Sequence, residues 1–185
     1  MASRALETSD AAGVAALIRA AFGAIPALDP PPSALRETKA SILAHLAAGG
    51  GGAVVMQAEL AAAVLWSEKD GGLYLGRLVT APRCQGQGLA TELVHAAEAE
   101  ARRRGLPRLH LGVRLALPGN RRLFARLGFT ETTLHAHPGH AEPTWTEAEK
   151  RLVTAPPPGT GTPPGSPDGP PLAAPSSARS RASAC

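Results

Sequence analysis

The most informative segment of the sequence covers Leu78 to Ala90 and reads LVTAPRCQGQGLA. An apolar strand ends at Thr80, Pro82 stops its ladder of hydrogen bonds, and a loop with two glycines then enters a long helix. The first N–H groups of a helix have no partner within the helix, and they lie at the positive end of its dipole. Gly86 and Gly88 would let an anion approach these groups without a Cβ in the way. The segment therefore predicts a site for a phosphate group.

Two well-known phosphate-binding loops do not fit this segment. No Gly-Lys-Ser/Thr follows the glycines, which excludes a P-loop. The preceding strand belongs to a meander and not to a parallel βαβ unit, which excludes the dinucleotide fingerprint. A glycine-containing turn without any ligand stays open as an alternative, because a single Gly-x-Gly pattern is a weak signal.

Hydrophobic periodicity predicts a mixed α/β (α+β) domain around this segment. We expect helices over residues 11–22, 33–48, 88–104 and 120–127. We expect strands over residues 53–57, 61–67, 73–80, 109–113, 128–135 and 143–152. The first three strands follow one another directly, which predicts an antiparallel meander. The second helix is expected to have Ser33 as its cap, to bury Leu35, and to end at the glycine run of residues 49–52.

The composition changes sharply after Thr154. Residues 155–185 hold 9 of the 18 prolines, and Leu172 is their one large aliphatic residue. Such a segment cannot bury enough apolar surface to offset its ordering entropy. We therefore expect one domain over residues 3–154 and a disordered tail, rich in Pro, Ala, Gly and Ser, over residues 155–185.

The charge of the chain does not favour a nucleic-acid-binding protein. The net charge of +4 comes from 19 basic and 15 acidic residues, and aromatic residues make up only 3% of the chain. Such a chain offers few stacking platforms for bases. The arginine run at residues 102–104 is the best hint of a basic surface, but its place at a helix C-terminus already accounts for it.

Apolar content and cysteine spacing predict a cytoplasmic protein. No apolar stretch approaches the roughly 20 residues that a membrane span needs, and the N-terminus lacks the apolar core of a secretory signal. Cys84 and Cys185 lie too far apart for a disulfide framework or a zinc ribbon. We expect no bound metal, although His135, His137 and His140 keep a zinc site open as a minor alternative.

The segment resembles the signature of the GNAT superfamily of acetyl-CoA-dependent N-acetyltransferases. The family pattern, Gln or Arg followed by x-x-Gly-x-Gly/Ala, is matched by Gln85-x-x-Gly88-x-Ala90. The later stretch Leu127-Gly128-Phe129 matches a second family pattern, and the predicted order of elements agrees over nearly the whole folded part. The resemblance implies a GNAT-like fold, in which helices flank a sheet whose two central strands splay apart.

The resemblance also implies acetyl-CoA as a co-substrate. In the family, the loop amides bind the pyrophosphate, and the pantetheine arm lies along the preceding strand like an additional strand. Carried over to this sequence, the cofactor-binding residues are Leu78, Val79, Thr80, Gln85, Gly86, Gln87, Gly88, Leu89, Ala90, Asn120 and Phe124. A helix N-cap is an equal alternative for Asn120. Arg83 and the Arg121-Arg122 pair are candidates to neutralise further phosphate charge.

The implied reaction is direct attack of a primary amine on the thioester carbonyl, without a covalent intermediate. The amine belongs to a small molecule, an amino acid or a peptide, and a homodimer is a further partner that the family implies. The family's usual general acid is a tyrosine at the position of Phe124, and phenylalanine cannot donate a proton. The weak catalytic candidates are Tyr74, His110 and Glu68, and a chain of ordered water would need none of them. A catalytically weak acyl-CoA-binding or regulatory domain is therefore the alternative function.

Overall fold

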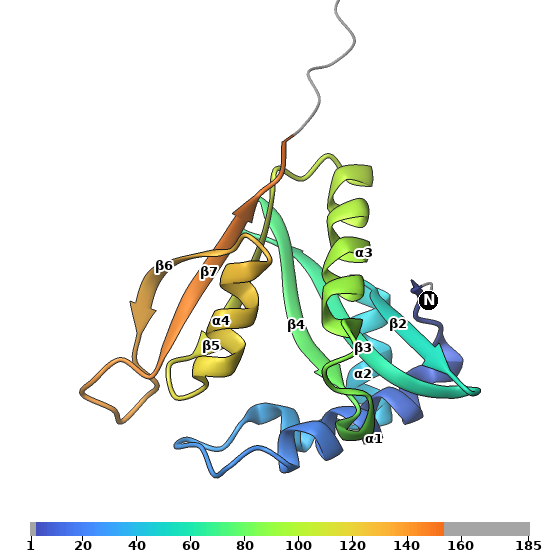
Figure 1. Cartoon of the computed structure of the whole chain (residues 1–185), viewed down its shortest axis with the longest axis horizontal. Helices are drawn as coiled ribbons and strands as arrows, with labels where there is room; N and C mark the ends of the chain where they lie inside the picture. The colour runs from blue at the N-terminus through green and yellow to red at the C-terminus, as the bar shows by residue number, and fades with distance from the viewer. Residues whose placement is uncertain (1–2, 154–185) are drawn as a thin grey trace, which may run out of the picture. The chain divides into compact units, whose positions relative to one another are not determined.

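The computed structural model describes residues 3–153 and contains one sheet flanked by helices (Figure 1). The strands are β1 Arg4–Ala5, β2 Gly51–Met56, β3 Glu59–Lys69, β4 Gly72–Thr80, β5 Arg108–Arg114, β6 Thr130–His135 and β7 Trp145–Arg151. The helices are α1 Ala11–Gly23, α2 Lys39–Ala48, α3 Leu89–Arg103 and α4 Pro118–Arg126, with short 3-10 turns η1 Thr8–Asp10, η2 Ser33–Arg36 and η3 Pro82–Cys84. Within residues 3–153, no helix has the length and apolar character that a membrane span requires. The predicted tail, residues 155–185, lies outside the described residues.

The sheet has the strand order β1-β2-β3-β4-β5-β7-β6. The strands β2, β3 and β4 form the predicted antiparallel meander. The strands β4 and β5 run parallel, because α3 carries the chain back between them. The expectation that the strand before the glycine loop belongs to no parallel βαβ unit is therefore wrong, because β4, α3 and β5 form one. The dinucleotide fingerprint is still excluded by its third glycine, since Thr91 stands at that position. The last strand, β7, lies between β5 and β6 and is antiparallel to both. The predicted mixed α/β fold is confirmed, whereas β1 is an addition to it, because a strand of two residues carries no periodic pattern.

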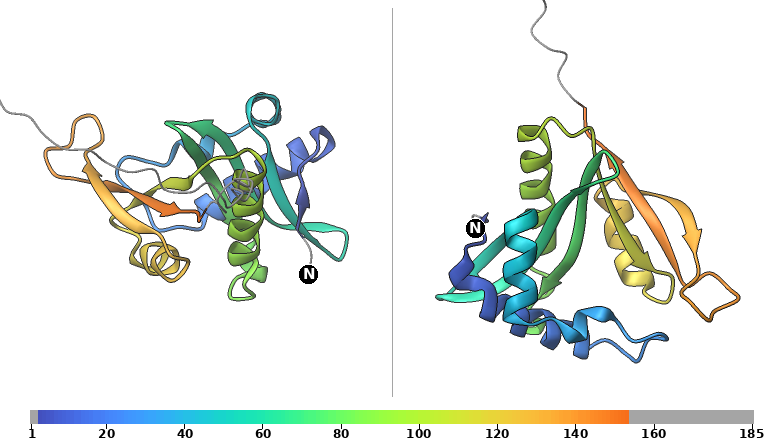
Figure 2. Two further views of the ribbon diagram at one scale, coloured as in Figure 1. Left: turned by 90° about the horizontal axis from the view of Figure 1, so that it is seen from above. Right: turned by 180° about the vertical axis from the view of Figure 1, so that it is seen from behind.

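Helices cover both faces of the sheet (Figure 2). On one face, Val14 and Ile18 of α1 and Ile42 of α2 are buried in a cluster with residues of β3 and β4. On the other face, Leu93 of α3 and Phe124 of α4 belong to a larger cluster that includes residues of β2 to β5 and β7. The apolar faces predicted from helical spacing are therefore the faces that pack on the sheet.

The central strands splay apart, as the resemblance implies. β4 and β5 are paired only at Leu73 with Leu109 and at Tyr74 with His110. Beyond these pairs the two strands diverge, which Figure 1 shows as an opening between them that widens toward the carboxyl ends. A β-bulge in β4, where Arg77 has a φ of +53°, lies at the start of this divergence.

The start of α2 differs from the prediction. Leu35 lies in the 3-10 turn η2 and is 38% exposed, so the expectation that it is buried is wrong. The helix α2 begins only after Thr38, so Ser33 does not cap it. The Thr38 hydroxyl instead accepts a hydrogen bond of 3.1 Å from the N–H of Ser41. Serine and threonine are both good caps, so the sequence offers two starts, and the extended backbone at Thr38 selects the second.

The glycine run after α2 also differs in part from the expected helix stop. Gly51 and Gly52 already belong to β2. A Cβ on Gly51 would lie 2.5 Å from the carbonyl oxygen of Val64 and 2.6 Å from the Leu6 side chain. Close packing of β2 against its neighbours therefore requires a residue without a side chain at this position.

Candidate functional site: an amide cradle at the end of β4

The loop between β4 and α3 presents a row of free backbone N–H groups. Gly86 and Gly88 have left-handed backbones, with φ values of +76° and +78°, and Gly88 is the N-cap of α3. The first backbone N–H of α3 with a protein acceptor belongs to Glu92, which donates to the carbonyl of Gly88 at 3.1 Å. Within residues 3–153, the N–H groups from Gly86 to Thr91 donate to no protein acceptor. We call this row, residues 86–91, the amide cradle.

The space in front of the two glycines is open. A Cβ built on Gly86 or on Gly88 would meet no atom within 4 Å. The two glycines are therefore not required by close packing within the protein, but by their backbone conformation and by the access they leave to the N–H groups. The positive end of the α3 dipole favours an anion at the same place.

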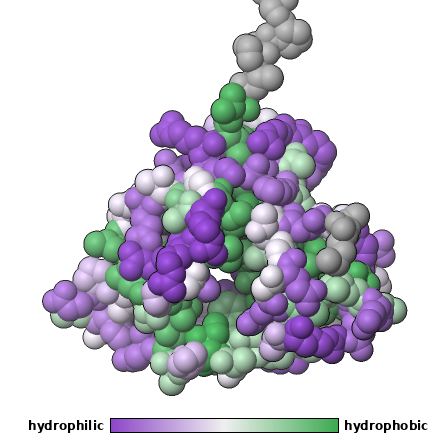
Figure 3. Space-filling model, in the orientation of Figure 1, coloured by the Kyte–Doolittle hydropathy of each residue, from purple (hydrophilic) through white to green (hydrophobic). Residues whose placement is uncertain are grey.

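A cavity of about 560 Å³ extends from the amide cradle along β4 toward α4 and the end of α1. Figure 3 shows an opening near the centre of the face drawn there, between the half that carries α4 and the half that carries β4. The cavity brings together most of the predicted cofactor-binding residues: Leu78, Val79, Thr80, Gln85, Gly86, Gly88, Leu89, Ala90, Asn120 and Phe124. Gln87 does not line it, and its side-chain amide lies 3.5 Å from the carbonyl oxygen of Arg83.

Several residues that line the cavity have no signal in the sequence. Ala21 and Phe22, in the last turn of α1, and Ile25, just after its end, form part of its wall. In the sequence, Phe22 indicates only the apolar face of a helix. The buried Cys84 lines it as well, and it belongs to the segment that predicts the site. The placement of α1 beside the end of β4 is a tertiary contact that no local pattern predicts.

The arginines around the cavity differ in how far their charges are already paired. Arg83 forms an ion pair with Glu59, and Arg121 donates two hydrogen bonds, of 2.7 and 2.8 Å, to Glu131. Arg126, by contrast, lines the cavity and forms no ion pair with any residue in the range 3–153. Arg126 is therefore the better candidate for a phosphate contact.

The two candidate residues of α4 lie on the cavity. Asn120 is the third residue of α4, whose N-cap is Leu117, so the alternative interpretation of Asn120 as an N-cap is wrong. Phe124 is 9% exposed, and its ring lies edge-on to that of Phe129, with centroids 5.6 Å apart. The side chain at this position, where the resemblance implies a tyrosine, therefore carries no hydroxyl group.

Tyr74 and His110 lie side by side at the narrow end of the splay. They form the last paired position of β4 and β5, and their ring centroids are 5.3 Å apart. The Nε2 atom of His110 lies 2.9 Å from the carbonyl oxygen of Lys69. Because a carbonyl oxygen only accepts, Nε2 carries the proton, and Nδ1 of the neutral ring is left as a proton acceptor. Neither residue lines the cavity itself.

Glu68 is separated from these two residues. It is paired with Leu73, which belongs to the core on the α3 side of the sheet. Successive side chains of a strand point to opposite faces, so Tyr74 faces away from the side on which Leu73 and Glu68 lie. The structure thus unites two of the three catalytic candidates and leaves Glu68 apart.

The face that carries Tyr74 includes residues that the sequence did not single out. A Cβ on Gly112 would lie 3.3 Å from the Trp145 ring and 3.9 Å from the Tyr74 hydroxyl, so these two side chains meet above Gly112. The His135 ring stacks on Trp145 at 4.2 Å, and its Nε2 lies 3.5 Å from Glu147. The β5–β7 register brings Trp145 close to Gly112, and the β6–β7 register places His135 opposite Trp145; only the folded chain fixes these registers.

The histidine pattern at residues 135–140 does not converge. His135 stacks on Trp145, whereas His137 and His140 have ring centroids 6.3 Å apart. Burial, followed by the charge of Arg114, lowers the pKa of His137. In the part of the chain that the structure describes, no group of three His, Cys, Asp or Glu side chains is placed to hold a metal ion.

The amide cradle, the splayed strands and the cavity beside them have the chemistry and the shape that suit an elongated, phosphate-bearing ligand. The chain belongs to the acetyltransferase (GNAT) family, whose model matches residues 21–129. No curated protein matches the chain in sequence.

Solved structures of several acetyltransferases share the fold. The ribosomal-protein-S18-alanine N-acetyltransferase of Escherichia coli is 20% identical, with a TM-score of 0.64 over 83% of this chain and 94% of its own. YncA of Salmonella typhimurium, solved with its cofactor acetyl-CoA, is 19% identical, with a TM-score of 0.66 over 86% of this chain and 98% of its own. The PaiA N-acetyltransferase of Thermoplasma acidophilum, in complex with coenzyme A, is 16% identical, with a TM-score of 0.66 over 82% of this chain and 100% of its own.

Proposed function

We propose that the protein transfers an acetyl group from acetyl-CoA to the primary amine of a small molecule, an amino acid or a peptide, by direct attack in a ternary complex. The observation that carries this proposal is the amide cradle, whose N–H groups have no acceptor among the described residues and which lies at one end of a cavity beside the splayed strands. Family membership and the complexes of YncA and PaiA with acetyl-CoA and coenzyme A support it.

The chain has groups for each part of the co-substrate. The pyrophosphate would accept hydrogen bonds from residues 86–91, and Arg126 is available for a further phosphate oxygen. The pantetheine arm would lie along Leu78 to Thr80, whose backbone faces the opening because β4 is not paired with β5 there. This arrangement directs the thioester toward the narrow end of the splay, where Tyr74 and His110 lie.

The reaction forms a bond between the amine nitrogen and the acetyl carbon and breaks the carbon–sulfur bond. The amine must lose a proton, and the departing thiolate must gain one. We assign the first transfer to Nδ1 of His110, directly or through water, because its Nε2 is held by the Lys69 carbonyl. Tyr74 lies beside it to orient the amine. Glu68 stays a weaker candidate on the other face.

Phe124 favours a second candidate function, an acyl-CoA-binding or regulatory domain with weak catalysis. It lines the cavity where a proton donor for the thiolate is expected, and it carries no exchangeable proton. Without another donor, the thiolate would depend on water, and transfer would be slow.

Turnover separates the two candidates. The full chain should be incubated with acetyl-CoA and, in turn, an alkylamine, an amino acid and a peptide with a free N-terminus, while thiol release is followed. Amine-dependent release that His110→Gln lowers in kcat but not in KM for acetyl-CoA would support the enzyme. Binding of acetyl-CoA without release above the amine-free background would favour the binding domain. Absence of binding would contradict both candidates.

A further inference from the structure

Arg77 occupies a backbone conformation that does not suit it. Its φ of +53° lies in the left-handed region, which residues with a side chain rarely adopt. Ala63 is paired with Val79 and Leu65 with Gly76, so Arg77 and Leu78 together stand opposite Val64. Arg77 is thus the residue of a β-bulge, and such a disfavoured conformation persists only where surrounding contacts hold it.

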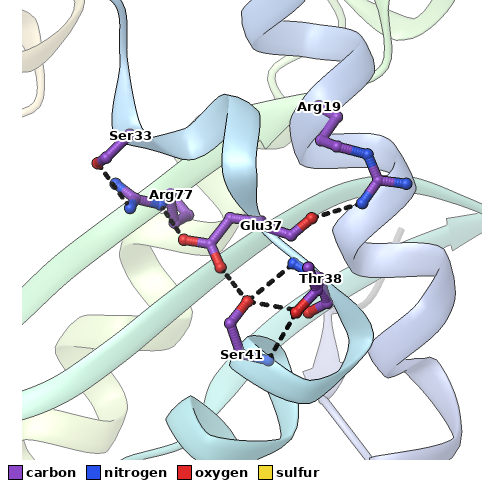
Figure 4. Close-up of polar contacts among 6 residues, drawn as sticks. All are labelled: Arg19, Ser33, Glu37, Thr38, Ser41 and Arg77. Carbon is purple, nitrogen blue, oxygen red and sulfur yellow. Dashed lines mark hydrogen bonds and ion pairs between the residues drawn. The ribbon is translucent and has the colours of Figure 1, made fainter.

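The contacts that hold Arg77 come from the segment between α1 and α2 (Figure 4). Its Nε donates to a Glu37 carboxylate oxygen at 2.7 Å, and its Nη2 donates to the Ser33 hydroxyl at 3.0 Å. The other carboxylate oxygen of Glu37 accepts a hydrogen bond from the Ser41 hydroxyl. Arg19 of α1 donates to the Glu37 carbonyl oxygen at 2.5 Å. The bulge is therefore tied directly to Ser33 of η2, and through Glu37 to α1 and α2.

This glutamate needs Arg77. Glu37 is only 6% exposed, and burial by itself opposes its ionisation, yet hydrogen bonds from Ser41 and Arg77 keep its pKa below the ordinary value. A buried carboxylate that loses its partner is left with an uncompensated charge. The Arg77–Glu37 pair therefore stabilises a single arrangement of β4 against the α1–α2 segment.

The bulge determines which way the end of β4 faces. Before it, Leu73 and Leu75 belong to the core on the α3 side of the sheet. After it, Leu78 packs against that core, and Val79 belongs to the core under α1 and α2. Strict alternation from Leu75 would place Val79 on the α3 side and Leu78 on the other. The bulge reverses this assignment for the residues that line the cavity.

We propose that Arg77 is a positioning residue for the acetyl-CoA site: its ion pair with Glu37 holds the bulge that sets the facing of Leu78, Val79 and Thr80. This inference rests on the proposed function for its ligand. It assigns Arg77 no contact with acetyl-CoA, because its guanidinium is occupied by Glu37 and Ser33. The inference also implies that Ser33 and Glu37, which lie between α1 and α2, help to determine the shape of the cavity.

The test compares Arg77→Met and Arg77→Lys with wild type in the full chain. Methionine keeps much of the side-chain length and removes the cation, whereas lysine keeps the cation beside Glu37. Arg4→Gln is the matched control, since Arg4 forms a two-bond pair with Asp10, at 2.7 and 2.8 Å, and does not line the cavity. Calorimetry measures affinity for acetyl-CoA, and amide hydrogen exchange of the unliganded proteins measures the pairing of β4.

We expect Arg77→Met to weaken acetyl-CoA binding by about tenfold or more. Without the ion pair, the orientation of residues 78–80 that binds acetyl-CoA is no longer the most populated one. We expect Arg77→Lys to stay within about threefold of wild type, since a cation still meets Glu37. Amide exchange should quicken at and after the bulge, in residues 77–80, and not before it, in Gly72 to Leu75. Affinity and exchange equal to those of Arg4→Gln would overturn the inference.

Hydrogen exchange also tests the role of Arg77 in two cases where the binding measurement cannot. If wild type binds no acetyl-CoA, the proposed function fails, and exchange in residues 77–80 alone decides the role of Arg77. If Arg77→Met does not fold, Glu37→Gln replaces it, because glutamine preserves the volume and removes the charge that attracts Arg77. The same local increase in exchange is then expected, and unchanged exchange would contradict the role of the pair.

Discussion

Gly88→Ala gives the sharpest test of the amide cradle. Gly88 has a φ of +78°, and a Cβ there would meet no protein atom within 4 Å. The folded protein therefore loses only the conformational preference of glycine, about 1–2 kcal/mol. A loss of this size lowers the Tm of a domain of this length by a few degrees, roughly 2–4 °C for each kcal/mol.

The cost to binding is separate, because the new methyl group would occupy the space through which a phosphate reaches the amides. Losing one hydrogen bond to a charged group costs about 1.5–3 kcal/mol, which corresponds to about 10- to 100-fold weaker binding of acetyl-CoA. Calorimetric titration of the full chain measures this loss, and thermal unfolding measures the stability.

Gly105→Ala is the matched control. Gly105 stands just beyond the other end of α3, with a φ of +70° and no atom within 4 Å of a Cβ, and it does not line the cavity. The two variants should lose similar stability, and only Gly88→Ala should lose affinity. If both bind acetyl-CoA equally well, the phosphates do not approach Gly88, and the reasoning is refuted.

Three further predictions concern catalysis, the amine side and pH. Phe124→Tyr should raise kcat for acetyl transfer by about tenfold with little change in KM for acetyl-CoA, because it restores a proton donor on the cavity wall; an unchanged rate of thiol release would show that the thiolate is protonated by another route. Gly112→Ala should raise KM for the amine and leave KM for acetyl-CoA unchanged, because the new methyl group would lie 3.3 Å from the Trp145 ring, beside the Tyr74 side chain that orients the amine. Steady-state kinetics with each substrate varied in turn measure both KM values, and a rise in both would contradict this prediction. Hydrogen bonds from Arg103, with those of Arg104, lower the pKa of Glu100 from 4.5 to about 2. The unfolded chain therefore binds a proton at Glu100 more readily than the folded protein does. The contribution of Glu100 to the free energy of unfolding is present above pH 4.5 and is lost as the pH falls toward about 2. Glu100→Gln should flatten that part of the pH dependence of urea unfolding, and an unaltered slope would contradict the assignment.

The sequence predicts the cradle well because its cause is local. A strand end, a proline and two glycines before an amphipathic helix determine a left-handed turn and free N–H groups within one segment. The same holds for the apolar face of α3, where Leu89, Leu93 and Val94 are buried as their spacing predicts.

The other parts of the site depend on contacts between distant segments. The wall formed by Phe22, the bulge at Arg77 and the meeting of Tyr74 with Trp145 have no local signature. An arginine with positive φ is stable because Glu37 is buried beneath it, and no propensity scale contains that information. The predicted start of α2 is wrong for a related reason. Ser33 and Thr38 are both good caps, and contacts between distant segments determine that the helix begins after Thr38.

The most direct test of the central claim is a crystal structure of the full chain with coenzyme A. We predict that the pyrophosphate oxygens accept hydrogen bonds from the N–H groups of residues 86–91 and that the pantetheine arm lies along Leu78 to Thr80, with its thiol directed toward Tyr74. Coenzyme A bound elsewhere, or with its phosphates away from the cradle, would contradict the account.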